Sequence, residues 1–394
     1  MDRTDGMIIP PGTRWLNDPD AQAVCKAVQS GGYDIHFVGG CVRNALLGLP
    51  DSDIDLATDA PPETVMKLAR AAGLKAVPTG IEHGTVTVVS AGHGFEVTTY
   101  RRDVETDGRR AVVAFSGDIV EDARRRDFTM NALYATPDGT VLDPLGGLSD
   151  LHAGVVRFIE DADARIQEDY LRILRFFRFS AYYGNPELGF DPQALNAVAR
   201  NLPGLETLSA ERVGAEITKL LAAPDPSRAV ATLRQTGVLQ VILPGCDDRW
   251  LAPVVHAEGV LTLAPDWQLR LAALGGSMVA ERLRLSKANA RVVEDISTAS
   301  YGAMSLAEVA YRMGDRVARG ALILRSVMAN APPDPDLLTG IAAASAARFP
   351  VTASDLMPEY GGPALGLRLK FLERAWIASE FGLDREALMA LPAD

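Results

Sequence analysis

The feature that most constrains the fold of this chain is a pair of glycines between a short apolar run and a helix-like segment. Residues 36–38 are apolar enough for a buried strand, Gly39 and Gly40 follow, and 41–47 has the pattern of a helix. Glycine allows the backbone to come close to a ligand, and a helix N-terminus favours anions. The order predicts a strand, a tight turn and a helix that together face an anion.

Two carboxylates follow, one residue apart. In a strand, Asp53 and Asp55 project from one face, whereas Ile54 and Leu56 point into the core. Paired carboxylates suit Mg²⁺, and Arg43 adds a fixed cation for phosphate. Each piece alone is usually a turn or a solvated strand end. In this order they predict a site for a nucleoside triphosphate and two metal ions, which activate a hydroxyl and stabilise leaving pyrophosphate.

The bulk composition limits the class of protein. The chain has 394 residues, is 47% hydrophobic and carries a formal net charge of −12. An acidic chain has no general affinity for nucleic acid, so any RNA contact must come from basic patches such as 101–126 and 165–178. Neither an export signal nor an apolar membrane span is expected. Three scattered cysteines suggest reduced thiols in a cytoplasm, with no zinc spacing.

Hydrophobic periodicity separates the chain into a mixed part and a helical part. Up to about residue 150 we expect strands at 85–89 and 95–100, a helix at 64–72, and a mobile loop over the charged segment 103–120. Residues 143–147 form a cluster of helix breakers and a hinge. Helices are expected at 164–181, 210–222, 226–237, 265–274 and 287–299, the last with Ser286 as its N-cap.

Two further groups of charged residues carry chemistry. Glu96 lies on the strand face opposite Phe95 and Val97, either as a third carboxylate beside the aspartates or as an ordinary exposed glutamate. An arginine run at 124–126 continues into an apolar segment, where Asp127 and Asn131 would share one helix face. There they would position Arg126 or contact a ribose; the alternative is a solvated basic face.

A polar stripe on the predicted 164–181 helix has residues that suit base recognition. Asp169, Arg172, Arg175 and Arg178 recur every three residues. A carboxylate accepts from the exocyclic amine of adenine or cytosine, and a guanidinium donates to the ring nitrogen, whereas guanine and uracil leave charges unpaired. Asp169 and Arg172 would select A and C, and the other two arginines would bind phosphates. The alternative is an amphipathic helix with a weak surface ion pair.

At these residues the chain resembles the class II branch of the tRNA nucleotidyltransferase and bacterial poly(A) polymerase family. Five ordered motifs carry the resemblance: Gly39-Gly40-x-Val42-Arg43 with Asp53-x-Asp55; Arg125-Arg126-Asp127-Phe128-Thr129-x-Asn131-Ala132; Asp143-x-x-Gly146-Gly147-x-x-Asp150; Glu168-Asp169-x-x-Arg172; and Ser209-Ala210-Glu211-Arg212 with Glu216.

The resemblance implies an α+β chain with a polymerase-β-like nucleotidyltransferase head and an all-α neck, body and tail. The implied bounds are 1–150 for the head, 151–225 for the base-recognising neck, 226–310 for the body and 311–394 for an RNA-binding tail. The implied reaction is attack of a tRNA 3′-hydroxyl on the α-phosphate of CTP or ATP, with no membrane partner and an oligomeric state that the sequence does not give.

The resemblance also assigns roles to the motif residues. Asp53 and Asp55 would bind Mg²⁺; the strand pattern, rather than the resemblance, predicts that Glu96 joins them as a catalytic carboxylate. The implied nucleotide-binding residues are Gly39, Gly40, Arg43, Arg126, Asp127, Asn131, Asp169, Arg172, Arg175 and Arg178. One position departs from the family, which usually has aspartate where this chain has Asn44. Asparagine still accepts a hydrogen bond from Arg43, so activity is expected to persist.

The motifs leave several functions open. Addition of C, C and A to tRNA is the leading interpretation, and the intact 103–120 segment favours it. A poly(A) polymerase using ATP alone, or an enzyme adding only CC or only A, has the same motifs. An inactive RNA-binding scaffold would have lost a metal carboxylate, yet both are present. A protein-modifying nucleotidyltransferase would not need the Asp169 and Arg172 pair.

Overall fold

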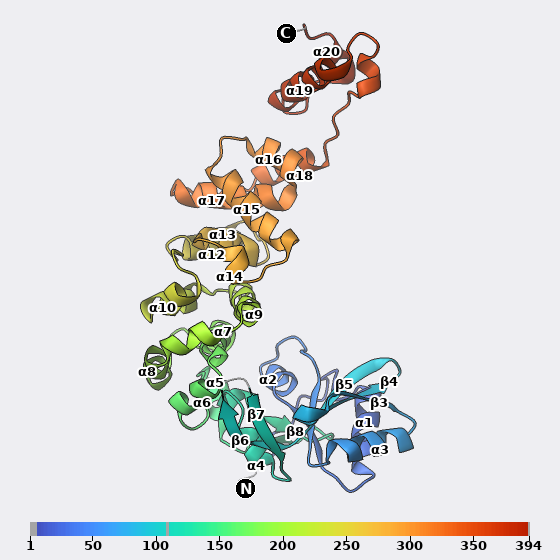
Figure 1. Cartoon of the computed structure of the whole chain (residues 1–394), viewed down its shortest axis with the longest axis vertical. Helices are drawn as coiled ribbons and strands as arrows, with labels where there is room; N and C mark the ends of the chain where they lie inside the picture. The colour runs from blue at the N-terminus through green and yellow to red at the C-terminus, as the bar shows by residue number, and fades with distance from the viewer. Residues whose placement is uncertain (1–5, 108–109, 393–394) are drawn as a thin grey trace. The chain divides into compact units, whose positions relative to one another are not determined.

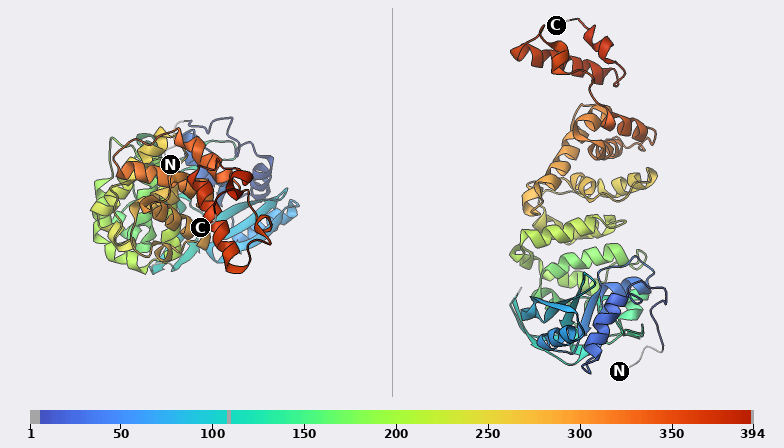
Figure 2. Two further views of the ribbon diagram at one scale, coloured as in Figure 1. Left: turned by 90° about the horizontal axis from the view of Figure 1, so that it is seen from above. Right: turned by 90° about the vertical axis from the view of Figure 1, so that its right-hand side faces the viewer.

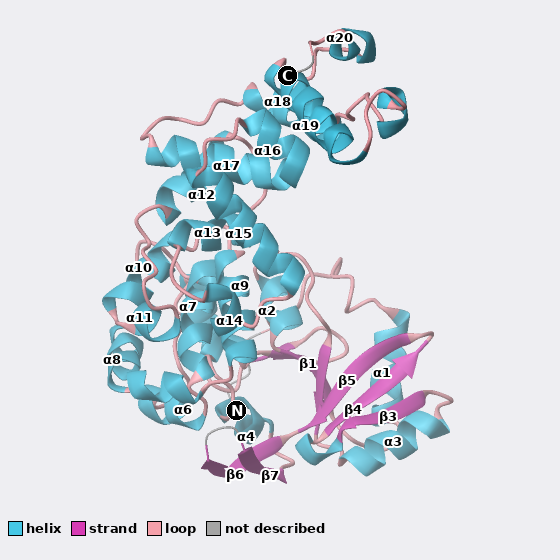
Figure 3. Cartoon of the chain, turned by 45° about the horizontal axis from the view of Figure 1, so that its top comes forward, coloured by secondary structure: helices cyan, strands magenta, loops and turns pink. Residues whose placement is uncertain are grey.

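The computed structural model describes residues 6–107 and 110–392. For residues 103–107 and 110–113 only the backbone is described. Its contacts divide the chain into two compact units. The first contains Met1–Ser209 with Gln235–Val241, and the second contains Ala210–Arg234 with Ile242–Asp394. In the described part, all strands lie in the first unit (Figure 3). A mixed head followed by helices confirms the α+β class.

A seven-stranded sheet with the order β3-β4-β5-β2-β1-β8-β9 forms the centre of the head (Figure 1). Its strands are β1 (Ile35–Val38), β2 (Asp55–Thr58), β3 (Lys75–Gly80), β4 (Thr85–Ser90), β5 (His93–Thr99), β8 (Tyr134–Ala135) and β9 (Val141–Leu142). The strand pair β2 and β5 is parallel, and β1 lies antiparallel to β2. The predicted strands at 36–38, 85–89 and 95–100 are thus confirmed.

Two helices cover one face of this sheet. α1 (Pro19–Gln29) begins with Asp18 as its N-cap and proline at its first position, both common helix-start signals. α3 (Pro62–Ala71) matches the predicted helix at 64–72. Both pack on β4 and on each other (Figure 1), because their apolar sides bury against the β-branched face of the sheet.

Two predicted elements are wrong. The segment 103–120, expected to be a loop, begins with an antiparallel hairpin of β6 (Arg101–Asp107) and β7 (Arg110–Phe115), followed by α4 (Ile119–Arg124). The β-branched residues of β7 favour a strand more than the charges of the segment oppose it. The single helix expected at 164–181 is two, α6 (Ala162–Glu168) and α7 (Leu171–Tyr183), since Asp169 between them is extended.

Besides an aromatic core, the first unit contains further helices. They are η1 (Ile81–His83), η2 (Thr129–Asn131), α5 (Gly147–Ala153), α8 (Pro192–Arg200), η3 (Leu202–Thr207) and α11 (Val238–Ile242), which ends at the second unit. Phe128, Phe158 and Phe176 pack with ring centroids 4.9–6.4 Å apart. The predicted hinge at 143–147 is an ordered helix start, where Asp143 accepts hydrogen bonds from the backbone N–H groups of Gly147 and Leu148.

The second unit is helical throughout its described residues (Figure 2). Its helices are α9 (Ala210–Leu221), α10 (Ser227–Gln235), α12 (Leu251–Val260), α13 (Trp267–Leu274), α14 (Val279–Arg282), α15 (Lys287–Tyr301), α16 (Leu306–Met313), α17 (Asp315–Met328), α18 (Leu337–Ala346), η4 (Ala353–Leu356), α19 (Gly362–Ala378) and α20 (Arg385–Met389). Ser286 caps α15 as predicted. The helices predicted at 210–222, 226–237, 265–274 and 287–299 are confirmed.

A buried ion pair joins helices within the second unit. Arg270 is 1% exposed and donates to the Glu258 carboxylate, with Nε to Oε2 3.0 Å and Nη2 to Oε2 2.7 Å. The same guanidinium donates to the carbonyls of Leu221, Ala223 and Pro224, at and just beyond the end of α9. Arg270 therefore satisfies carbonyl groups that have no partner inside the helix.

None of the helices in the described residues is both long enough and apolar enough to cross a membrane.

The division into a head, neck, body and tail at residues 150, 225 and 310 stays a prediction, because the contacts define two units rather than four parts.

Candidate active site

A cavity of about 550 Å³ lies in the first unit. Its walls come from the glycine turn, the start of β2, the arginine run and α7. The lining residues are Gly39, Gly40, Arg43, Ser52, Asp53, Asp55, Arg125, Arg126, Asp127, Asn131, Asp169, Arg172, Arg175, Arg178 and Phe179. All ten residues predicted to bind a nucleotide are among them, together with the two aspartates predicted to bind metal. Six arginines make this wall suited to a polyanion.

The glycine turn depends most on Gly39, while Gly40 is closely packed. Gly39 has a φ of 73°, a backbone conformation that side chains disfavour. A Cβ atom on Gly40 would lie 2.9 Å from Ser52 Oγ. The turn leads from β1 into α2 (Gly40–Leu46), as predicted. The Gly39 N–H donates to the Leu133 carbonyl, so it holds the turn against the neighbouring chain segment.

The carboxylates gather at the start of β2. Asp53 precedes the strand and Asp55 is its first residue, with Leu56 buried and Ile54 half-buried as the alternation predicts. Parallel pairing places Glu96 of β5 opposite Asp55. Glu96 is exposed and stands outside the set of residues that line the cavity.

The charges around Asp55 favour a cation. Desolvation by the cavity walls raises the pKa of Asp55, and the nearby charges of Glu96 and Asp53 raise it further against the opposing effect of Arg126. A divalent ion would relieve this repulsion. Among the described residues, no group of three or more His, Cys, Asp or Glu side chains is arranged to hold a metal. A pair of carboxylates fits an ion that takes its remaining ligands from substrate phosphates and water.

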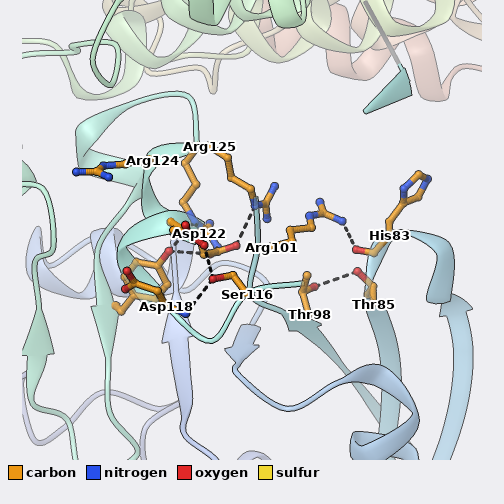
Figure 4. A network of polar contacts seen from close by, with 12 residues as sticks. His83, Thr85, Thr98, Arg101, Ser116, Asp118, Asp122, Arg124 and Arg125 are labelled. Atoms are coloured by element: carbon orange, nitrogen blue, oxygen red, sulfur yellow. Dashed lines mark hydrogen bonds and ion pairs between the residues drawn. The ribbon is translucent and has the colours of Figure 1, made fainter. Parts of the chain in front are cut away.

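Asp122 on α4 holds two of the cavity arginines (Figure 4). Its buried carboxylate accepts from Arg125 Nε at 2.9 Å, Arg126 Nη2 at 3.0 Å and the Tyr134 hydroxyl at 2.7 Å. Burial alone would raise the pKa of Asp122, but Arg126, Arg125 and the Tyr134 hydroxyl outweigh it and lower the pKa to about 2. Arg126 is thus positioned by Asp122 and Tyr134, and not by Asp127 and Asn131 as expected.

Asp127 and Asn131 instead connect two other arginines. Asn131 ends the 3₁₀ helix η2 and Asp127 precedes that helix, so the two do not share the expected α-helix face. Asp127 accepts from Asn131 Nδ2 at 2.9 Å and from Arg175 Nε at 2.7 Å. The amide oxygen of Asn131 accepts a hydrogen bond from Arg43. The pair therefore joins the glycine-turn helix to α7 through a continuous polar chain.

The two residues predicted to read the base both line the cavity. Asp169 accepts from the Leu171 backbone N–H in the break between α6 and α7. Arg172 forms an ion pair with Glu168 and donates to the carbonyls of Arg165 at 2.7 Å and Arg125 at 3.1 Å. These contacts fix the guanidinium at the end of α7 that faces the arginine run.

Several cavity and supporting residues escaped the sequence patterns. Ser52 and Phe179 line the cavity, and Asp122 and Tyr134 support it. Asp122 stands four residues before Arg126, so helical spacing could have indicated their ion pair. The Phe179 ring lies 5.3 Å from the Arg175 guanidinium carbon and 4.4 Å from that of Arg178, but an aromatic residue on an amphipathic helix gives no such signal.

Asp122 provides a test of this network. Asp122→Asn is expected to reduce the free energy of unfolding by about 2 kcal/mol at neutral pH, since the pKa lies about two units below its ordinary value. A depressed carboxyl pKa stabilises the fold above the unfolded-state value of about 3.9 and loses that effect as the pH falls toward 2. The difference in the free energy of unfolding between the variant and the parent, measured by urea titration, should therefore become smaller as the pH decreases. Asp51→Asn, the same change on an exposed residue, is the control; a difference that stays constant with pH would contradict the assignment.

Two family models match the chain. The model described as "Poly A polymerase head domain" matches residues 35–157. The model described as "Probable RNA and SrmB- binding site of polymerase A" matches residues 188–249. The first match contains the glycine turn, the paired aspartates and the arginine run, and thus much of the cavity wall.

Relatives and solved structures agree with these matches. A CCA-adding enzyme of Geobacillus stearothermophilus is 37% identical over 284 residues, which are 70% of this chain and 68% of that protein. Human mitochondrial CCA tRNA nucleotidyltransferase 1 is 43% identical over 190 residues, 48% of this chain and 44% of that protein. The crystal structure of the Bacillus stearothermophilus CCA-adding enzyme in complex with CTP has a TM-score of 0.73 and 29% identity, covering 92% of this chain and 93% of that one.

A more distant structure shares the fold. The Thermotoga maritima CCA-adding enzyme has a TM-score of 0.69 at 17% identity, and the alignment covers 97% of this chain and 98% of that one. The extent of the closer matches, together with the cavity and its motifs, decides the family. The chain belongs to the class II branch of the tRNA nucleotidyltransferase and bacterial poly(A) polymerase family.

Proposed function

We propose that the protein adds C, C and A to the 3′ end of tRNA, using CTP and ATP and no nucleic-acid template. The observation that carries this proposal is one cavity that combines paired carboxylates, six arginines and the Asp169 and Arg172 pair. The relatives of this chain are named for CCA addition, which agrees with such a site.

The reaction needs a nucleophile, a leaving group and stabilisation of charge. The terminal hydroxyl of the RNA loses its proton to water, and its oxygen forms a bond to the α-phosphorus. The bond from that phosphorus to the oxygen bridging the α- and β-phosphates breaks, and pyrophosphate leaves with both electrons of that bond. Asp53 and Asp55 would hold Mg²⁺, which when bound stabilises negative charge on the phosphate oxygens. Glu96 would add a third carboxylate beside Asp55.

The arginine wall would bind the triphosphate. Arg43, Arg126 and Arg175 are anchored by Asn131, Asp122 and Asp127, which gives each guanidinium a fixed place. Arg178 lines the same wall, and Gly39 and Gly40 let phosphate groups approach the backbone closely. Fixed donors lose little conformational entropy when the ligand binds.

Asp169 and Arg172 would select the base. The Asp169 carboxylate can accept from the exocyclic amine of cytosine or adenine, and Arg172 can donate to the adjacent ring nitrogen. Uracil and guanine would present a carbonyl to the carboxylate and an N–H to the guanidinium. Because both mismatches leave a desolvated charge unpaired, the pair would disfavour these bases.

Asp169→Asn tests the base selection. An amide presents either a donor or an acceptor, so we expect the ratio of CTP to UTP incorporation to fall about tenfold or more. The ratio of kcat/KM values for the two nucleotides on one tRNA primer measures the effect. Asp161→Asn, at the start of α6 and outside the cavity, is the control; an unchanged ratio would contradict the role of Asp169.

The activity itself is tested with purified protein, Mg²⁺ and a tRNA that lacks its 3′ CCA, supplied with CTP and ATP separately and together. The expected result is two C additions followed by one A and then termination. Long A tails from ATP alone would instead identify a poly(A) polymerase. Addition that stops after CC, or that needs a primer already ending in CC, would identify an enzyme of partial activity.

A further inference from the structure

The Arg43 guanidinium hydrogen-bonds to neutral groups, while the nearby charge of Asp127 raises its pKa and that of Arg178 lowers it. Arg43 is only 6% exposed, and all three of its hydrogen-bond acceptors are uncharged oxygens. Nη1 donates to the Asn131 amide oxygen, and Nη2 donates to the Asn44 amide oxygen at 3.0 Å and to the Tyr183 hydroxyl at 2.8 Å. In contrast, carboxylates hold four other arginines of the cavity, namely Arg125, Arg126, Arg172 and Arg175.

Aromatic rings complete the surroundings of this guanidinium. Its central carbon lies 4.2 Å from the centroid of the Tyr183 ring and 5.1 Å from that of Phe179, both on α7. Ring faces attract a cation without neutralising it. Burial lowers the pKa of Arg43, and the Tyr183 contact raises it. Its Nε is buried without a partner, although the residue lines the cavity.

Asn44 is oriented so that its oxygen faces Arg43. Its amide nitrogen donates to the Pro50 carbonyl at 2.9 Å, and its oxygen accepts from both Arg43 and the Tyr183 hydroxyl, the latter at 3.3 Å. An aspartate here would place a carboxylate oxygen against the Pro50 carbonyl. The surroundings of this position therefore suit asparagine. Because the Asn44 amide is neutral, Arg43 needs another acceptor, and the Tyr183 hydroxyl provides it.

We propose that Tyr183 is a positioning residue that, together with Asn44, aims Arg43 at the phosphates of the incoming nucleotide through neutral hydrogen bonds, without pairing it directly with a carboxylate. This inference rests on the proposed function, because it assumes a nucleotide in the cavity. Arg43 would act on the triphosphate that CTP and ATP share. Loss of the Tyr183 hydroxyl should therefore weaken both nucleotides equally and leave base selection unchanged.

The test uses Tyr183→Phe, which keeps the ring and removes the hydroxyl. Binding of CTP and of ATP with Mg²⁺, in the absence of RNA, is measured by isothermal titration calorimetry. We expect about a five- to tenfold weaker Kd for each nucleotide, as for the loss of one hydrogen bond of ordinary strength. Tyr182→Phe, a partly exposed neighbour on the same helix, is the matched control and should stay within about twofold of the parent.

A double-mutant cycle separates positioning from a general effect on folding. In an Arg43→Met background, Tyr183→Phe should cause no further loss of CTP affinity, because its effect passes through the guanidinium. Steady-state incorporation into tRNA should show the loss in KM, with kcat within about twofold of the parent, since nucleotide binding rather than chemistry is affected. Thermal unfolding of each variant confirms that it is folded.

Several results would overturn the inference. They are a Tyr183→Phe affinity equal to that of Tyr182→Phe, a loss confined to one nucleotide, or a further loss in the Arg43→Met background. Failure of the proposed function is a separate result: the parent enzyme would then bind neither nucleotide, or would incorporate neither C nor A.

Discussion

Asp55→Asn is expected to reduce the rate of C addition by about a thousandfold or more, because a metal that stabilises the phosphate charge contributes several kcal/mol to the barrier. Asparagine has nearly the shape of aspartate, so the sheet pairing with Glu96 should persist. The variant loses the charge that holds a cation. Single-turnover incorporation of CMP into tRNA lacking CCA, at saturating CTP, measures the loss directly.

Two controls make this result interpretable. Asp51→Asn makes the same chemical change at an exposed residue outside the cavity and should leave the rate unchanged. RNA binding by the Asp55 variant should also remain. Turnover that survives in Asp55→Asn would sink the assignment of metal ligands. Glu96→Gln then distinguishes two roles. If Glu96 is a third catalytic carboxylate, the rate of C addition should fall severely; if it only adjusts the charge around Asp55, the rate should change little.

Arg270→Met is expected to cost about 3–5 kcal/mol of stability, the largest change in folding that we predict. The substitution removes the partner of a carboxylate that is 3% exposed and leaves three helix-end carbonyls without their donor. Burial already raises the pKa of Glu258, and loss of Arg270 removes its main compensating charge. The urea midpoint of the second unit, monitored through hydrogen exchange in α9 and α13, measures this loss of stability.

The double variant Arg270→Met with Glu258→Leu identifies the cause. If the cost comes from an isolated charge, replacing the glutamate should restore part of the stability, because apolar pairs often substitute well for buried ion pairs. Recovery should be incomplete, since the carbonyls remain unsatisfied. Arg249→Met, in an exposed pair with Asp247, should have no measurable effect. Equal costs at Arg270 and Arg249 would rule out the burial argument.

Local patterns predicted the parts of the site that lie close together in the sequence. Gly39 has a positive φ, and Asp53 and Asp55, one residue apart at the start of β2, both line the cavity, so both features could be expected from a few residues. The arginines of α7 followed from helical spacing. In each case the chemistry depends on residues within one element and its neighbour.

The contacts that hold these residues in place were not predictable, because their partners are distant in the sequence. Tyr183 contacts Arg43 across 140 positions, and Asp127 contacts Arg175 across 48. Hydrophobic periodicity indicates which side of a helix or strand is buried, but it does not indicate which residues that side contacts. For the same reason the pattern predicted that Asp127 and Asn131 would position Arg126 or contact a ribose, and it gave no sign of their contacts with Arg175 and Arg43.

The short segment 122–126 has a consequence for how nucleotide preference can change. The Asp122 side chain holds Arg125 and Arg126 beside the phosphate wall, and the Arg125 carbonyl holds Arg172, the proposed base reader. Because a main-chain oxygen makes this last contact, side-chain substitution at Arg125 does not remove it. One six-residue helix and its end therefore tie the grip on the phosphates to the reading of the base. A new nucleotide preference would therefore have to arise through residues outside segment 122–126, such as Asp169 or other residues that line the cavity.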